Sequence, residues 1–180
     1  MPIEIIKDDH TAWDAWKKEL DLMEKKVVKV GVLEGSDDHK SEDGRPPVKM
    51  VVIAATHEFG ADITVTDKMR WYLHNIGIHL RSDTTKIHIP ERSFLRTWVE
   101  ENKSKIEEAI GEMFDQVNTG KLTAKKALNK LGAFAESGIK EKFKNNDWEP
   151  LKFRSGSPLI DKGQLRASIH HKVADVGEPE

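Results

Sequence analysis

Two long amphipathic segments joined by a very short connection are the feature that most constrains how this chain folds. Apolar residues recur at helical spacing over 95–117 and again over 124–143, as in helices that bury one face. Helices joined by so few residues usually pack antiparallel. We therefore predict an antiparallel pair of helices over 93–118 and 123–144.

Four residues are suited to mark helix boundaries. Gly60 and Gly120 follow apolar helical patterns, where glycine readily adopts the left-handed conformation of a C-cap. Thr123 precedes the second long helix, and its hydroxyl can accept a hydrogen bond from a free backbone amide. Pro90 is well placed for the first turn of the first long helix, because proline lacks the amide that such a turn leaves unpaired.

Three further segments have helical spacing. We predict helices over 11–26, with Thr11 as its cap, over 48–59 and over 67–75. The helix over 48–59 has an obvious apolar stripe, which we expect to face the core. Its members are Val48, Val51, Val52, Ala55 and Phe59.

Short segments rich in β-branched residues, or alternating in polarity, predict strands. They cover 27–33, 63–66, 77–80, 86–89 and 168–173, with 77–80 and 86–89 as a hairpin and all five able to form one sheet. The fold class is then α+β: a small antiparallel or mixed sheet packed against several helices. We expect a single domain over 1–180, a hairpin-like insertion at 62–88, and flexible segments at 34–47 and 175–180.

Composition excludes several classes of protein. The 180 residues include no cysteine, which excludes disulfides and thiolate chemistry. No apolar run is long enough to span a bilayer, and the first residues lack the pattern of a signal peptide. We therefore expect a soluble protein made in the cytoplasm, with no membrane partner. The net charge of −2 argues against a chain that binds nucleic acid with its whole surface.

The charge is nevertheless segregated along the chain. Residues 34–43 and 100–115 each carry a net charge of −4, whereas 121–144 carries +5. Solvated helix and loop faces are one explanation. The other is that acidic and basic faces meet between copies of the protein, in a head-to-tail contact that favours a ring or a tube.

Signals for catalysis and for metal binding are weak. The chain has eight histidines, but His57 lacks the second histidine at i+4 that a helical zinc pair requires, and His79 and His88 would be cross-strand neighbours without a carboxylate. There is no nucleophile elbow and no phosphate-binding loop. We expect no enzymatic activity, cofactor or catalytic residue; a small metal-dependent hydrolase built on the histidines is the alternative.

Two segments carry more specific detail than a plain scaffold requires. One joins His57-Glu58-Phe59-Gly60 to the segment 89–96, Ile-Pro-Glu-Arg-Ser-Phe-Leu-Arg, in which Arg92 and Arg96 lie one turn apart at a helix start. Such a start can receive a carboxylate from elsewhere. We take Glu58, Arg92 and Arg96 as candidate interface residues.

The other segment runs from Pro158 to Ile169, Pro-Leu-Ile-Asp-Lys-Gly-Gln-Leu-Arg-Ala-Ser-Ile. Asp161 can cap a short helix there, with Gln164 at the capping-box position, before the last strand. Asp161, Gln164 and Arg166 are further candidate interface residues.

These motifs, in this order after the valine-rich strand and around the two long helices, resemble those of the tail-completion or neck proteins of long-tailed bacteriophages, also described as virion morphogenesis or minor tail-component proteins. The resemblance spans about 27–174. It departs from the family pattern in the long insertion between the first two motifs and in the short linker before Pro158.

The resemblance implies a non-enzymatic structural role at the junction of head and tail. Family members have a small α+β fold and assemble into rings, often six-fold, around the channel through which DNA passes. The implied partners are copies of the chain itself, the tail terminator, the tail-tube and the head-side connector proteins. The implied location is the virion neck or tail, after assembly in the cytoplasm of the bacterial host.

A nucleic-acid-binding module is the alternative function. It would use the basic helix over 121–144, whose basic residues include Lys125, Lys126, Lys130, Lys140 and Lys144. Binding would be weak, non-specific and strongly salt-dependent. Lys125, Lys126 and Lys130 are also candidates for an assembly interface.

Overall fold

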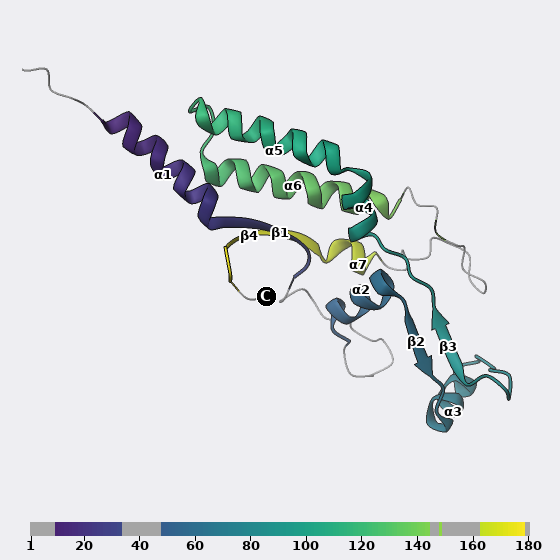
Figure 1. Cartoon of the computed structure of the whole chain (residues 1–180). Coiled ribbons are helices and arrows are strands. Elements are labelled where there is room, and N and C mark those ends of the chain that lie inside the picture. The colour runs from purple at the N-terminus through teal and green to yellow at the C-terminus, as the bar shows by residue number, and fades with distance from the viewer. Residues whose placement is uncertain (1–9, 34–47, 145–147, 149–162, 179–180) are drawn as a thin grey trace, which may run out of the picture.

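A computed structural model describes residues 10–33, 48–144, 148 and 163–178. The fold is α+β, as predicted (Figure 1). The helices are α1 (Thr11–Lys25), α2 (Met50–Phe59), α3 (Asp67–Asn75), α4 (Leu95–Glu101), α5 (Lys103–Asn118), α6 (Ala124–Lys142) and α7 (Gln164–Ala167). The strands are β1 (Lys26–Val32), β2 (Ala61–Thr64), β3 (Lys86–Ile89) and β4 (Ile169–Asp175).

The two long helices α5 and α6 lie side by side and antiparallel, as their short connection predicts (Figure 1). Gly120 has a positive φ of 69° just after α5, and the hydroxyl of Thr123 accepts a hydrogen bond from the amide of Lys126 at the start of α6. Both predicted caps of this turn are therefore confirmed.

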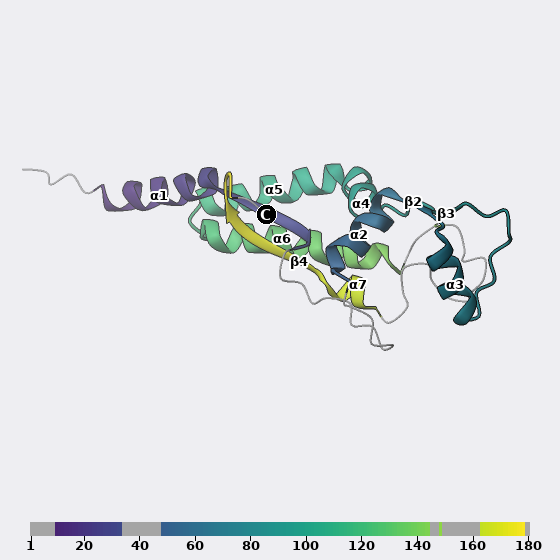
Figure 2. The same ribbon diagram turned by 90° about the horizontal axis from the view of Figure 1, so that it is seen from below.

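Strand β1 pairs antiparallel with β4, although the two are far apart in the sequence. The register places Val28 opposite Val173 and Val32 opposite Ile169. This twisted ribbon lies along α6 (Figure 2). Burying one face of the ribbon against a helix compensates for the low stability of a two-stranded sheet by itself.

The predicted single sheet and the predicted 77–80 strand are wrong. Strand β3 pairs with β2, with Ile63 opposite Ile87, and the two strands form a second sheet beside α3. The backbone of 77–80 instead follows the end of α3, where the amide of Ile78 donates to Leu73. The guanidinium of Arg70 donates to the carbonyls of Arg81 and Thr84 at 2.7 and 2.6 Å, which holds this loop against the helix.

The helix predicted over 93–118 is divided into α4 and α5. The side-chain amide of Asn102 donates to the carbonyl of Trp98 at 2.9 Å, and Asn102 has a φ of −115°. A side chain that bonds to a nearby carbonyl competes with the helical ladder. Pro90 is not in a first helical turn, because the amide of Arg92 donates to the carbonyl of His57 and keeps this segment non-helical until Leu95.

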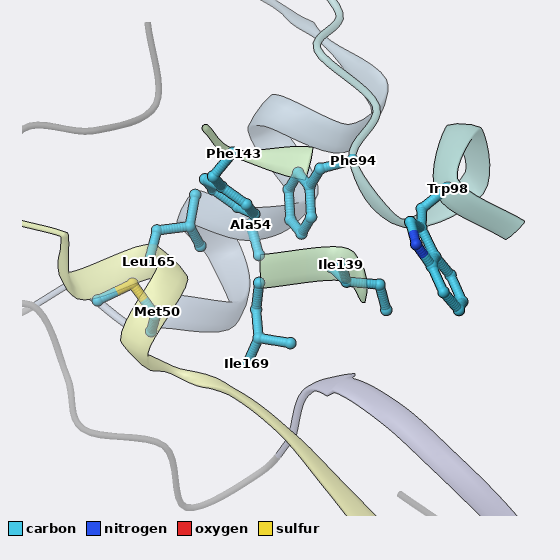
Figure 3. Packing of buried hydrophobic residues seen from close by; sticks show 8 residues of the cluster. All are labelled: Met50, Ala54, Phe94, Trp98, Ile139, Phe143, Leu165 and Ile169. Atoms are coloured by element: carbon cyan, nitrogen blue, oxygen red, sulfur yellow. The ribbon is translucent and has the colours of Figure 1, made fainter. Parts of the chain in front are cut away.

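The core lies where α2, α4, α6 and α7 meet the start of β4 (Figure 3). Phe94, Phe143 and Ile169 are its largest fully buried side chains, and the two phenylalanine rings pack 4.9 Å apart. Met50 and Ala54 enter this cluster from α2, and Leu165 enters it from α7. Segments from both halves of the described chain thus build one core.

The apolar stripe predicted for α2 faces the opposite way. Val51, Val52 and Phe59 are 47%, 52% and 69% exposed, whereas Met50, Ala54 and Glu58 form the buried face. Apolar residues surround most of this short helix, so periodicity alone does not determine its rotation. The position of Glu58 determines it, as described below.

Two N-caps also differ from prediction. The cap of α1 is His10, and Thr11 is already helical. The cap of α7 is Gly163, with a φ of 73°, so the helix starts three residues after Asp161. Asp161 itself and the segment 34–47 lie outside the described residues. Strand β4 is longer than predicted and extends to Asp175, which forms an ion pair with Lys26 at 2.7 Å.

Two glycines in long helices allow a matched test of this packing. A Cβ at Gly132 would overlap the ring of His171, whereas a Cβ at Gly111 would meet nothing within 4 Å. We expect Gly132→Ala to lower the free energy of unfolding by about 1–3 kcal/mol. We expect Gly111→Ala to raise it by about 0.5–1 kcal/mol, because alanine has the higher helix propensity. Urea unfolding followed by circular dichroism measures both, and destabilisation by Gly111→Ala would contradict the described packing.

Candidate functional site

The carboxylate of Glu58, at the end of α2, lies on the N-terminus of α4. It accepts hydrogen bonds from the hydroxyl of Ser93 at 2.6 Å and from the amides of Phe94, Leu95 and Arg96 at 2.9, 3.0 and 2.9 Å. Glu58 is 5% exposed. A side chain from another helix therefore satisfies the free amides with which α4 begins. We call this group, residues 57–60 with 89–96, the α2–α4 junction.

The local sequence explains how the two segments of the junction meet. Gly60 ends α2 with φ 70° and ψ 169°, a conformation that is essentially restricted to glycine. A Cβ there would lie 3.0 Å from the carbonyl oxygen of Ile89. The predicted glycine cap is therefore confirmed in position, but its ψ is extended rather than left-handed helical. The close approach lets the chain return from β3 directly beside the end of α2.

Hydrogen bonds hold Glu58 in its charged form. Burial raises the pKa of this carboxyl group, but the hydrogen bonds from Ser93 and from the amides of 94–96 outweigh it and lower the pKa below its usual value. The positive end of the helix dipole favours the same charge. An ionised carboxylate that accepts four hydrogen bonds is suited to stabilise a helix start, and it is poorly suited to exchange protons.

Arg92 and Arg96 do not bind this carboxylate with their guanidinium groups. Arg96 forms an ion pair with Glu91 at the surface. Arg92 is 7% exposed, and its Nε has no hydrogen-bond partner among the described residues. Burial, and then the charge of Arg92, lower the pKa of His57. The backbone amides of the helix start, rather than the two guanidinium groups, bind the incoming carboxylate.

The three candidate lysines lie at the other end of α6. They line a groove of about 640 Å³, which we call the α6 groove. Lys125, Lys126 and Lys130 are exposed and form no ion pair with any described residue. The remaining lining residues are Leu122, Asn129, Ala133 and His171. The structure brings these lysines together, but it places them far from the α2–α4 junction (Figure 1).

A half-buried charge cluster beside this groove was not predicted. Glu136 on α6 accepts hydrogen bonds from Nζ of Lys140 at 2.6 Å and from the amide of His171 at 3.1 Å, and it bonds Nδ1 of His171 at 2.5 Å. Burial raises the pKa of Glu136, but Lys140 and His171 outweigh it and lower the pKa to about 2. The i, i+4 spacing of Glu136 and Lys140 is the only sequence signal for this cluster.

The last two described candidates, Gln164 and Arg166, lie on the short helix α7 beside α2. The histidines that the structure describes do not gather in the way the hydrolase alternative requires. His88 bonds Asp62 at 2.7 Å and His79 bonds His74 at 2.8 Å, so the expected pairing of His79 with His88 is wrong. The described part of the chain has no cluster of three potential metal ligands among histidine and acidic residues. It also has no helix long and apolar enough to cross a membrane.

Comparisons of the chain with protein-family models, with curated proteins and with solved structures found no match.

The hydrogen bonds of Glu58 can be tested by substitution. We expect Glu58→Gln to lower the free energy of unfolding by about 2–4 kcal/mol, because an amide cannot replace a charged acceptor of four hydrogen bonds in a buried position. Glu91→Gln is the control, since it removes an exposed ion pair that is worth less than about 1 kcal/mol. Urea unfolding measures both variants, and equal effects would contradict the capping role of Glu58.

The lowered pKa of Glu136 predicts that its contribution to stability is lost at acidic pH. Since its pKa is about 2 when folded and 4.5 ordinarily, its stabilisation is present above pH 4.5 and is lost as the pH falls from about 5 to 2. We expect Glu136→Gln to lower the free energy of unfolding by about 2 kcal/mol at pH 7 and by much less at pH 2. Urea midpoints at pH 7, 5, 3 and 2 test this, with exposed Glu100→Gln as the control. A loss that does not change with pH would contradict it.

Proposed function

We propose that this protein is a structural component of a long-tailed bacteriophage or prophage, and that it acts in tail completion or head–tail joining by assembling into a ring at the neck. The motifs described above, and their order along the chain, suggest this role. The proposed role is non-enzymatic, and the proposed partners are copies of the chain together with the tail terminator, tail-tube and head-side connector proteins.

The α2–α4 junction is the observation that carries the proposal. Two of the motifs behind the resemblance, His57–Gly60 and Ile89–Arg96, are separated in sequence by β2, α3 and β3. In three dimensions they form one unit, because the carboxylate of Glu58 binds the start of α4. Because one interaction uses both motifs, their joint occurrence is not well explained as a coincidence of two separate capping patterns.

The surface of the chain also supports an assembly role. The exposed apolar face of α2 contains Val51, Val52 and Phe59. Exposed apolar patches often mark contacts with other proteins. The acidic residues of α5 and the lysines of α6 add charged surfaces that are suited to contacts between copies.

Nucleic-acid binding is the second candidate function, and the α6 groove favours it. Three lysines without ion-pair partners among the described residues could bind a phosphate backbone. The two phenylalanines of the basic segment 121–144 offer no platform for base stacking, because Phe143 is fully buried and Phe134 packs on Trp98. We expect a gel shift at about 150 mM salt to show no complex, because so few contacts bind weakly and non-specifically. A stable complex under these conditions would favour this candidate over the assembly role.

Deletion of the gene from the phage or prophage that carries it tests the assembly role. We expect electron microscopy to show unjoined heads and tails, or incomplete tails, and infectivity to fall by orders of magnitude. Supplying the intact gene from a plasmid should restore joined particles, which controls for effects on neighbouring genes. Normal particles with unchanged infectivity would overturn the proposal.

A further inference from the structure

The outward face of α5 combines acidic and apolar residues. Glu107, Ile110, Gly111 and Phe114 have the i, i+3, i+4, i+7 spacing of one helix face. Ile110 and Phe114 are 46% and 44% exposed. Glu108 and Asp115 flank them, and none of the three acidic residues forms an ion pair with a described residue. We call Glu107, Glu108, Ile110, Gly111, Phe114 and Asp115 the α5 face.

The α6 groove has the complementary character. Its rim carries Lys125, Lys126 and Lys130, and its lining includes the apolar side chains of Leu122 and Ala133. Two neighbouring carboxylates are already bound, Glu136 to Lys140 and His171 and Glu19 to the amide of Ala124. The groove therefore has a positively charged rim and an apolar floor, and it has room for the side chains of a partner.

The charges of the two surfaces are not paired with each other within the described part of the chain. Helices α5 and α6 pack side by side, yet the lysines of the groove and the acidic residues of the α5 face all remain exposed and unpaired within the described part of the chain. Lys142 of α6 forms an ion pair with Glu101 of α4 at 2.7 Å, but this pair lies near the other end of α6. The unpaired charges therefore remain available to another molecule.

We propose that the α6 groove binds the α5 face of a second copy of this chain, with Ile110 and Phe114 over the apolar floor and the three acidic residues against the three lysines. This rests on the proposed function, since it names the contact by which copies would assemble. The contact joins two different surfaces, so each copy keeps one of each free, and repetition yields a ring when the rotation closes.

The apolar residues on both surfaces favour a protein partner over a nucleic acid. A phosphate backbone would neutralise the lysines, but it would leave Leu122, Ala133, Ile110 and Phe114 exposed to water. The α5 face of another copy satisfies both the charge and the apolar floor. Such a contact is stabilised by burial as well as by charge.

A charge-exchange experiment tests the contact in the full chain. One variant, Lys125→Glu/Lys126→Glu/Lys130→Glu, makes the groove acidic. The other, Glu107→Lys/Glu108→Lys/Asp115→Lys, makes the α5 face basic. Sedimentation equilibrium should show that wild type self-associates with rising concentration, and less at high salt. Each variant alone should associate about 100-fold more weakly or worse, because like charges then meet, and an equimolar mixture of the two should recover association.

The control variant is Lys49→Glu/Lys68→Glu/Lys86→Glu, which changes the net charge as much as the groove variant does but at exposed positions elsewhere. It should associate like wild type, and circular dichroism should show that all the variants are folded. Recovery on mixing would also exclude misfolding as the cause of the loss.

Other outcomes would overturn the inference in distinguishable ways. If both triple variants associate like wild type, the copies meet elsewhere and the ring proposal survives. If the control variant loses as much association, net charge rather than this contact is responsible. If the groove variant loses only DNA binding, the groove is a nucleic-acid site. If wild type remains monomeric throughout, the contact does not form, and the deletion phenotype decides separately whether the proposed function fails.

Discussion

The capping of α4 by Glu58 is the interaction on which much of this structure depends. A helix that starts inside the protein presents free amides that must find acceptors, since leaving them unpaired is costly. Here the acceptor is a carboxylate from α2, which is separated from α4 in sequence by a complete strand–helix–strand unit. The interaction places α2, and with it Met50 and Ala54, against the core of α4, α6 and β4.

The same interaction explains the unusual surface of α2. Turning Glu58 inward turns the valine-rich face and Phe59 outward, although those side chains are the more apolar. Turned the other way, α2 would bury its valines and Phe59, but it would lose the four hydrogen bonds of Glu58 together with the burial of Met50 and Ala54. Internal stability and an exposed apolar surface thus have a common cause. In the proposed assembly, the junction supports the subunit at one end of α6, while the groove and the α5 face contact other copies.

The candidate site could be predicted only in part. Glycine at 60, a helix start near 93 and the lysines of α6 were all identified from sequence, because glycine placement, helical spacing and charge runs are local signals. The partner of the helix start was not, since no local signal links Glu58 to residues 35 or more positions later. The cluster of Glu136 with His171 was missed for the same reason: its two halves meet only when β4 packs on α6.

The amino-acid sequence by itself determined several elements, because each of them depends mainly on residues nearby in the chain. These are the helices α3, α5 and α6, the strands β1 and β3, and the caps at Gly120 and Thr123. Tertiary structure decided which strands pair, which face of α2 is buried and where α4 begins. Those outcomes depend on polar groups that find partners far along the chain, as the buried carboxylate of Glu58 does at the start of α4 and the amide of Arg92 does at His57. Periodicity describes how much apolar surface a segment can bury, but the need to find hydrogen-bond partners for most of the buried polar groups selects the arrangement that buries it.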